Sequence, residues 1–227
     1  MPSQITNYQC PACTGGLHFS SATGKLECEY CGSSYTVEEI EAFYAQKDEA
    51  AAQAQAKAEA KAEAQAQMFP AEQLFRAGNF EAALNGDGNT LGFTDIIDNY
   101  GKRAGKAANL YAGLCNLQLG NNEEAIAFLK KYSVKDKIMQ ARAYSAIGDA
   151  YSNLKDYTNA LAWYKKAAAL EDNEFRPAYL LKAALVMEET GDTAGALSLY
   201  KEIETKYPQT VEGYDIQKYI SRIENQK

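Results

Sequence analysis

Four cysteines near the start of the sequence are the residues whose types and spacing are best suited to chemistry. They form two Cys-x2-Cys pairs, and fourteen residues separate Cys13 from Cys28. The two-residue spacing lets a tight turn direct both sulfur atoms of a pair toward one ion, and two such pairs complete the tetrahedron that Zn²⁺ prefers. The spacing therefore predicts a metal site whose ligands are Cys10, Cys13, Cys28 and Cys31.

A structural zinc ion is the favoured occupant of this site. Four thiolates close the coordination shell, whereas a catalytic zinc keeps one position open beside three protein ligands. A redox-active dithiol pair and an iron site are the alternatives, and the first of them makes a thiol redox sensor a minor hypothesis for function. Four of the five cysteines lie in the first 31 residues, which argues against an extracellular disulfide framework. We therefore expect a reducing compartment and a cytoplasmic protein.

The segment between the two pairs is predicted to be a β-hairpin. Leu17, Phe19 and Leu26 alternate with polar residues around a turn-rich stretch at 20–24. The only histidine, His18, is expected at a polar position of this hairpin. It could replace a thiolate ligand, but four cysteines already suffice.

Residues 8–36 resemble a zinc ribbon, a fold found in general transcription factors and in many small bacterial proteins. Gly32 follows the second pair and tolerates a positive φ. The sequence departs from the ribbon pattern at Thr14, where a glycine is expected, and we expect the next residue, Gly15, to compensate. About 46 residues bury too little surface to fold alone, so metal binding should supply most of the stability of this segment.

The ribbon resemblance also implies an alternative function, a nucleic-acid- or transcription-associated regulator. Charge opposes it, because the first 46 residues contain five Glu and one basic residue, Lys25. Contacts to phosphate groups need Lys and Arg. We therefore expect a ribbon that contacts protein or is purely structural, and no nucleic-acid partner.

Composition divides the chain of 227 residues into three segments. Residues 1–36 are predicted to form the zinc ribbon, residues 37–67 a helical spacer of Ala, Gln, Lys and Glu, and residues 68–227 a helical repeat domain with a C-terminal capping helix. The hydrophobic fraction of 46% is enough for a core, and the net charge is −7. No apolar run is long enough to span a bilayer.

The spacer is predicted to be one long helix. Thr36 and Glu39 form a capping box at its start. Alanine alternates with polar residues at 54–66, which is the period of a strand, but these residues are strong helix formers and poor strand formers. We expect the Met68-Phe69-Pro70 segment to end or kink this helix.

Small residues recur with a fixed period in the C-terminal segment. Gly113, Gly148 and Ala184 are 35 and 36 residues apart. A second set of small residues lies twelve residues later with the same spacings, and it consists of Ala125, Ala160 and Ala196. In every unit, a predicted turn falls between the first and the second small residue. Each unit is therefore predicted to be two helices that cross at small residues. The fold class is mainly α, a solenoid of helical hairpins preceded by a small β ribbon and a long helix.

The repeat resembles the tetratricopeptide repeat, whose period is 34 residues. The best copy contains Tyr144, Ile147, Gly148, Tyr151, Tyr157, Ala160, Tyr164 and Ala167. The stretch from Met68 is also similar to bacterial tetratricopeptide proteins of an ancillary, translocon-associated type. That similarity rests on Phe-Pro-Ala-x-x-Leu-Phe at 69–75 and Ala-Leu-Asn-Gly-Asp-Gly-Asn at 83–89. Relatives of that type carry a transmembrane anchor before this domain, where this sequence has the polar spacer and the ribbon.

The resemblance implies a concave groove, lined by the first helix of each unit, that binds a protein or peptide. The groove positions carried over from it are Leu110, Leu114, Arg142, Ser145, Asp149, Asn153, Leu181 and Leu185. They lack the paired Lys and Asn of clamps for chaperone C-termini, so a helix or extended peptide of mixed polarity is the expected ligand. The alternative is that the chain's own N-terminal helix fills the groove.

No residue set typical of catalysis is present in the sequence. It has no phosphate-binding glycine loop, no Ser/His/Asp set and only one histidine. Residues 85–89 alternate oxygen side chains as a calcium loop does, but Thr90 stands where that loop needs glycine and Ile96 where it needs glutamate. Cys115 is expected to be a buried packing residue. The leading hypothesis is a non-enzymatic protein-interaction scaffold that carries a structural zinc ribbon.

Overall fold

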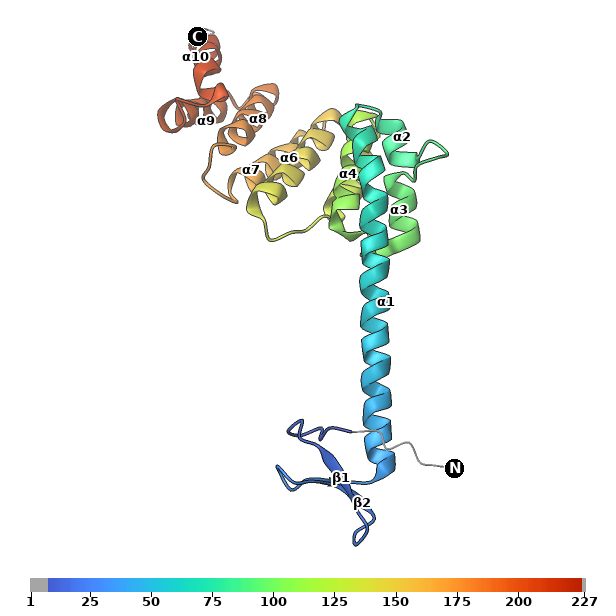
Figure 1. Ribbon diagram of the computed structural model, residues 1–227. Helices are drawn as coiled ribbons and strands as arrows, with labels where there is room; N and C mark the ends of the chain where they lie inside the picture. Colours follow the sequence, from blue (N-terminus) through green and yellow to red (C-terminus); the bar gives the residue numbers. More distant parts are fainter. Residues whose placement is uncertain (1–7, 226–227) are drawn as a thin grey trace. The chain divides into compact units, whose positions relative to one another are not determined.

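The computed structural model describes residues 8–225, apart from the side chain of Arg103 (Figure 1). The chain divides into two compact units, and the boundary lies between Ala60 and Lys61. The first unit contains a small sheet and the second contains stacked helices. We describe each unit by itself.

The sheet of the first unit has three antiparallel strands in the order β1-β2-β3. They are β1 (Leu17–Ser20), β2 (Lys25–Cys28) and β3 (Ser34–Tyr35). Leu17 pairs with Cys28, and Leu26 pairs with Tyr35. The predicted hairpin is therefore present, and its register places Cys28 at the end of β2.

Helix α1 (Val37–Arg76) begins directly after the sheet. Its start is the predicted capping box: the Thr36 N–H donates to Glu39 Oε2 at 2.8 Å, and the Glu39 N–H donates to Thr36 Oγ1 at 3.1 Å. Ile40 is fully buried. The hydroxyl of Tyr44 donates to the carbonyl oxygen of Gln9 at 2.8 Å, so the first two turns of α1 hold the strand that leads to Cys10.

Of the two outcomes expected at Met68-Phe69-Pro70, an end of the helix is wrong, because α1 continues through Pro70 to Arg76. Pro70 has no N–H for the preceding turn, which costs about 3 kcal/mol in a helix interior. Met68 and Ala71, on either side of it, are buried in a hydrophobic cluster that also contains Phe93. Burial of this last part of α1 offsets the lost hydrogen bond.

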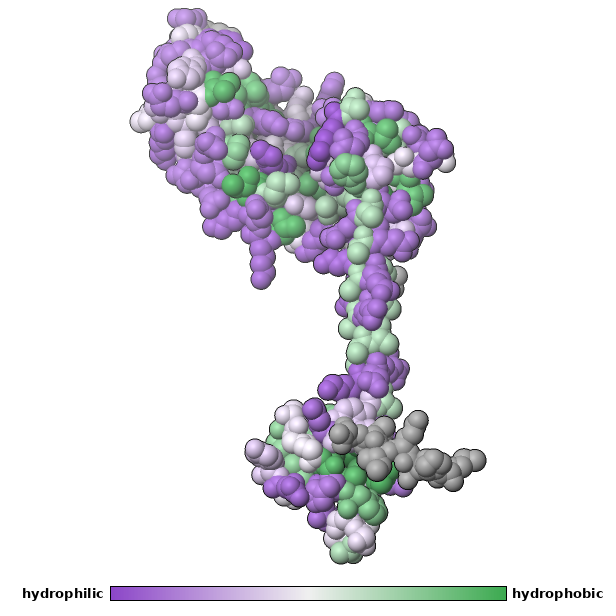
Figure 2. Space-filling view, viewed as in Figure 1, coloured by the Kyte–Doolittle hydropathy of each residue, from purple (hydrophilic) through white to green (hydrophobic). Residues whose placement is uncertain are grey.

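The exposed part of α1 has little large apolar surface. On the face seen in Figure 2, weakly hydrophobic (pale green) and hydrophilic (purple) residues are interspersed along it. Among the described residues, no helix is both long and apolar enough to cross a membrane.

The second unit contains nine further α-helices among the described residues, and they pack mainly against their neighbours in sequence. They are α2 (Phe80–Asn85), α3 (Phe93–Tyr100), α4 (Gly105–Gln118), α5 (Asn122–Lys131), α6 (Lys137–Asn153), α7 (Tyr157–Ala168), α8 (Arg176–Glu189), α9 (Thr193–Lys206) and α10 (Val211–Glu224). A short 3₁₀ helix, η1 (Gly101–Arg103), precedes α4. This is a helical-hairpin solenoid, as the repeat pattern predicts.

Small residues lie where the two helices of a hairpin cross. A Cβ atom on Gly113 of α4 would lie 2.6 Å from Cγ of Leu129 on α5. On Gly148 of α6, it would lie 2.5 Å from Cε1 of Tyr164 on α7. The second small residue of each repeat is also fully buried; these are Ala125, Ala160 and Ala196. The period in the sequence thus marks the sites where two helix backbones approach most closely.

Helix α10 covers the end of the solenoid, where the sequence predicts a capping helix. Ile216, Ile220 and Ile223 form one buried face of α10 in the same cluster as Tyr200 of α9. Glu188 of α8 accepts hydrogen bonds from Arg222 at 2.6 Å and from the Tyr200 hydroxyl at 2.5 Å. The last three helices are therefore joined by packing and by one charged network.

Candidate metal centre and candidate binding groove

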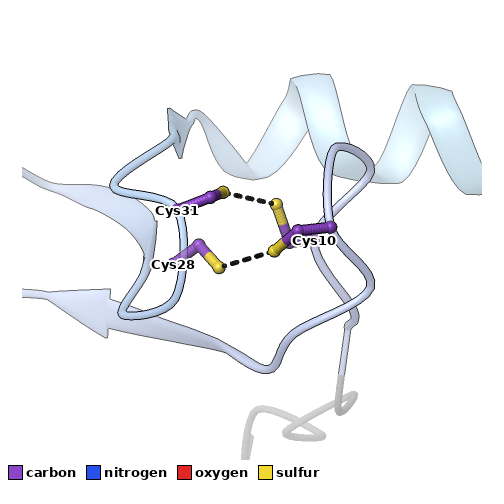
Figure 3. Close-up of side chains that lie close together, drawn as sticks. Cys10, Cys28 and Cys31 are labelled. Carbon is purple, nitrogen blue, oxygen red and sulfur yellow. Dashed lines mark hydrogen bonds between the residues drawn. The ribbon is translucent and has the colours of Figure 1, made fainter.

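The four predicted ligand sulfurs lie together in the first unit. All four are within 4.8 Å of one another. The Cys10 and Cys31 sulfurs are 3.6 Å apart, and the Cys13 and Cys28 sulfurs are 3.4 Å apart (Figure 3). Four sulfurs at 2.3 Å from a tetrahedral zinc ion are separated by about 3.8 Å. The thiol set therefore fits such an ion.

Two loops with the same hydrogen-bond pattern present the sulfurs. In the first loop, the Cys10 N–H donates to the Gly15 carbonyl at 2.6 Å, and the Thr14 N–H donates to the Cys10 carbonyl at 2.8 Å. In the second loop, the Cys28 N–H donates to the Ser33 carbonyl and the Gly32 N–H donates to the Cys28 carbonyl, both at 2.9 Å. The first cysteine of each loop is buried and the second is exposed. Each pair therefore contributes one buried and one exposed cysteine to the candidate site.

The residue after each pair adopts a left-handed conformation. Gly32 has φ of 72°, as the sequence predicts, and Thr14 has φ of 62°. The expectation that Gly15 compensates for Thr14 is wrong, because Thr14 itself takes the left-handed conformation. Gly15 has a different role. A Cβ atom there would lie 3.2 Å from Cβ of Tyr30 and 3.4 Å from the sulfurs of Cys13 and Cys28, so glycine avoids a close contact with Tyr30.

Polar neighbours contact the cysteine thiols and change the pKa of Cys31. Hydrogen bonds with the side chain and the backbone of Ser33 lower the pKa of the Cys31 thiol to about 6. The Tyr35 hydroxyl lies 3.8 Å from the Cys10 sulfur. Since the thiolate is the form that binds metals, Ser33 favours the ligand state of Cys31. His18 lies outside the sulfur cluster, on β1, with its Nδ1 atom 3.9 Å from a Glu29 carboxylate oxygen.

The second candidate site is a groove across the first helices of three successive hairpins. It contains a cavity of about 360 Å³ that is lined by residues of α4, α6 and α8. The lining residues are Leu114, Leu117, Gln118, Arg142, Ser145, Ala146, Asp149, Phe175, Ala178, Tyr179 and Lys182. None of them belongs to α1, so the described part of the N-terminal helix does not form this cavity.

Charged groups of the groove differ in how they are paired. The ammonium of Lys182 lies 2.7 Å from Asp149 Oδ2 and 3.2 Å from Ser145 Oγ. Asp149 also accepts a hydrogen bond from the Tyr164 hydroxyl at 2.7 Å. Burial, and then the charge of Asp149, raise the pKa of Tyr164 above its ordinary value, so the hydroxyl remains a donor.

Arg142 is exposed, and its guanidinium lies 5.0 Å from the centre of the Phe175 ring. It takes part in no ion pair within the described residues. The groove therefore has one free cationic group beside an apolar wall.

The structure brings together four of the eight predicted groove residues: Leu114, Arg142, Ser145 and Asp149. Leu110 is instead buried in the core, and Leu181 packs against the C-terminal cluster. Leu185 is exposed beside a neighbouring cavity. Asn153 donates to Asn122 Oδ1 at 2.9 Å and ties α6 to α5.

Sequence reasoning missed Phe175, Tyr179 and Lys182, all of which line the groove. Phe175 lies just before α8 and occupies no position of the repeat pattern. The repeat spacing could have identified the groove positions of α8, because Ala178 stands 36 residues after Arg142 and Lys182 is one helical turn after Ala178. The positions chosen on α8, Leu181 and Leu185, face other parts of the fold.

Two other motifs have packing or turn roles. Cys115 is fully buried, and burial raises the pKa of its thiol to about 12, so it is not an activated nucleophile. Asp87 Oδ1 accepts hydrogen bonds from the N–H groups of Asn89 and Thr90 at 3.0 and 2.7 Å. These bonds build a turn from the loop that resembles part of a calcium site.

Family models of the tetratricopeptide repeat match three segments of the second unit. One model matches residues 141–174, and another matches residues 107–135 and 178–210. The chain contains tetratricopeptide repeats. The three matched segments cover most of the hairpins α4–α5, α6–α7 and α8–α9, so the groove lies on the first helices of the tetratricopeptide repeats.

Two solved structures of similar fold are both described as crystal structures of MamA. One has a TM-score of 0.53 at 20% sequence identity and covers 68% of this chain and 92% of that chain. The other has a TM-score of 0.55 at 19% identity, with 71% and 86% covered. At these identities the similarity concerns the tetratricopeptide solenoid alone. No curated protein matches the chain.

Proposed function

We propose that this protein is a non-enzymatic scaffold that binds a polypeptide partner in the groove of its tetratricopeptide repeats. The observation that carries the proposal is the cavity of about 360 Å³ shared by α4, α6 and α8. Its walls come from three repeats, so an occupant contacts all three hairpins at once. Tetratricopeptide proteins are generally scaffolds, which supports the non-enzymatic assignment.

The lining of the groove indicates the chemistry of the partner segment. Leu114, Leu117 and Tyr179 offer an apolar wall, which suits a large hydrophobic side chain. Arg142 is exposed and free of carboxylates, so a Glu or Asp of the partner is expected opposite it. The partner segment is thus a helix or extended peptide with apolar anchors beside an acidic residue.

Affinity capture with groove variants tests this function. In Arg142→Glu the groove loses its free cation, and in Ala178→Trp a bulky side chain enters the cavity that Ala178 lines. We expect each change to weaken binding of the captured partner by about tenfold or more, because residues at the centre of an interface dominate its affinity. Partner recovery is measured by quantitative mass spectrometry after capture on the immobilised full chain.

The matched control is Lys165→Glu, the same charge reversal at an exposed position of α7 that does not line the groove. Partner recovery with this variant should equal that with the unaltered chain. Circular dichroism checks that all three variants keep their helical content. Equal recovery by the unaltered chain and both groove variants would refute the groove as the binding site.

We also propose that Cys10, Cys13, Cys28 and Cys31 hold a structural Zn²⁺ ion, in a zinc ribbon of a cytoplasmic protein. The proposal is supported by four sulfurs within 4.8 Å and by the two loops of identical hydrogen-bond pattern. A zinc ion there would join the two loops and hold the three-stranded sheet against the start of α1. Four thiolates leave no position for substrate, so the role is structural.

Metal analysis of the purified protein tests the zinc proposal. We expect one zinc per chain, and close to none in a Cys28→Ser variant, because a hydroxyl is a poor zinc ligand. The control is Cys115→Ala, which removes a buried thiol of the second unit and should keep one zinc. Inductively coupled plasma mass spectrometry measures both. Iron in place of zinc, or a metal-free protein, would contradict the proposal.

A further inference from the structure

A second cavity, separate from the groove, lies at the start of α4. Its volume is about 630 Å³, within the range of small-molecule sites. The residues that line it come from α3, η1, α4 and α5, and they are Ile97, Gly101, Lys102, Gly105, Lys106, Asn109 and Lys131. Three of these seven residues are lysines, although the chain as a whole has a net charge of −7.

The three lysines are exposed, and none of them pairs with a carboxylate within the described part of the chain. Lys106 donates a hydrogen bond to the carbonyl oxygen of Ser133, and this contact anchors its side chain. An ammonium group has three donors, so two remain for another acceptor. The Lys131 ammonium lies over the Phe128 ring, 4.9 Å from its centre. The cavity therefore concentrates positive charge that the protein itself does not neutralise.

Two further features of the first turn of α4 suit an anionic ligand. No side chain caps the start of α4, since its N-cap residue is Ala104. Its first N–H groups and the positive end of its dipole therefore add to the field of the lysines. One turn further on, the side-chain oxygen of Asn109 is buried without a hydrogen-bond partner. An orphan acceptor of this kind is costly unless a ligand or water supplies a donor.

We propose that this cavity binds a small organic phosphate of nucleotide size. Three ammonium groups match the two or three negative charges of a diphosphate. Helix N-termini bind phosphate groups through free N–H groups. Ile97 and the aliphatic stems of the lysines give a wall for the non-ionic part of the ligand, and a hydroxyl or amine of that part donates to Asn109. This site shares no lining residue with the partner groove, so it can fail or succeed independently of the proposed scaffold function.

Isothermal titration calorimetry of the full chain tests the proposal with ADP, pyrophosphate and adenosine as probes. We expect ADP to bind, pyrophosphate to bind more weakly, and adenosine to give no heat. In the double variant Lys102→Gln with Lys131→Gln, ADP should bind at least about tenfold more weakly, because each charged hydrogen bond contributes strongly to affinity. Glutamine removes the charge and keeps a polar, hydrogen-bonding side chain of similar size.

Lys165→Gln, an exposed lysine of α7 outside the cavity, is the matched control and should change ADP affinity less than twofold. Amide chemical shifts provide a second readout: ADP should shift the signals of Gly105 and Lys106 most. Absence of heat with both ADP and pyrophosphate would overturn the proposal. So would adenosine binding as tight as ADP, or equal losses in the double variant and the control.

Discussion

At the scale of single residues, the two cysteine loops differ at one equivalent position. Thr14 and Gly32 each follow the second cysteine of a pair, and both have φ between 60° and 75°. Glycine adopts this conformation freely, whereas a β-branched residue such as threonine is strained there. The cost for a residue with a Cβ atom is roughly 1–2 kcal/mol. The first loop therefore contains strain that the second loop lacks.

Thr14→Gly should tighten metal binding by relieving this strain. A gain of about 1 kcal/mol corresponds to roughly fivefold higher affinity for zinc. Competition with a chromophoric chelator measures the change. The reciprocal variant, Gly32→Ala, introduces a Cβ atom at φ of 72° and should weaken binding by a similar factor. Opposite shifts in the two variants are the expected signature, and a weaker site in Thr14→Gly would contradict it.

The turns between the two helices of each hairpin also differ in whether glycine occupies the position of positive φ. Gly120 and Gly191 have φ of 82° and 84° in the turns of their hairpins, and Lys155 takes φ of 59° at the matching position. The turn geometry is thus kept in all three repeats although one of them lacks glycine. The Lys155 N–H donates to the Ser152 carbonyl and the Asp156 N–H donates to the Tyr151 carbonyl, both at 2.9 Å, and the other two turns contain the same pair of bonds.

At the scale of helices, the crossing of α6 and α7 depends on the absence of a side chain at Gly148. Tyr164 packs against this position and is nearly fully buried. The Tyr164 hydroxyl donates a hydrogen bond to Asp149, which also accepts one from Lys182 of α8. A shift of Tyr164 would therefore disturb the hairpin and the groove together.

Gly148→Ala should destabilise the repeat unit despite the better helix propensity of alanine. Overpacking costs about 1–3 kcal/mol, and the propensity gain returns up to about 1 kcal/mol. We expect a net loss of about 1–2 kcal/mol in the free energy of unfolding, measured with urea. In a Tyr164→Leu background, which lacks the ring, the same substitution should be neutral or stabilising. Equal losses in both backgrounds would exclude the proposed clash.

At the scale of the whole molecule, the cysteine cluster and the repeats belong to different compact units. All four sulfurs lie before residue 32, whereas the core clusters of the repeats begin at Met68. The small sheet buries few large side chains, so we expect its order to depend on the proposed metal ion. The stacked helices have their own cores and do not.

Chelation should therefore unfold one unit and spare the other. After metal removal, we expect hydrogen exchange of residues 9–35 to become at least about tenfold faster, since structural zinc supplies most of the folding energy of such small units. Exchange of α4 to α9 should not change. Mass spectrometry of peptides from the intact chain measures both in one experiment. Loss of protection in the repeats would show that their stability also depends on the metal.

The sequence by itself determined the local features of this protein. The two Cys-x2-Cys pairs predicted the sulfur cluster, because so short a spacing leaves few ways to place two sulfurs. The period of the small residues predicted the crossing points of the hairpins, because only small side chains fit between closely packed helices. These signals depend on neighbours in sequence, or on one pattern repeated along the chain.

Tertiary structure decided what depends on contacts between distant segments. Packing of Met68 and Ala71 against Phe93 carries α1 through Pro70, against its local preference. The rotation of α8 places Lys182 rather than Leu181 in the groove. The lysines at the start of α4 come from separate elements and meet only in the folded chain. A sequence pattern records which face of a helix is apolar, but only the folded structure determines which residues of other helices that face meets.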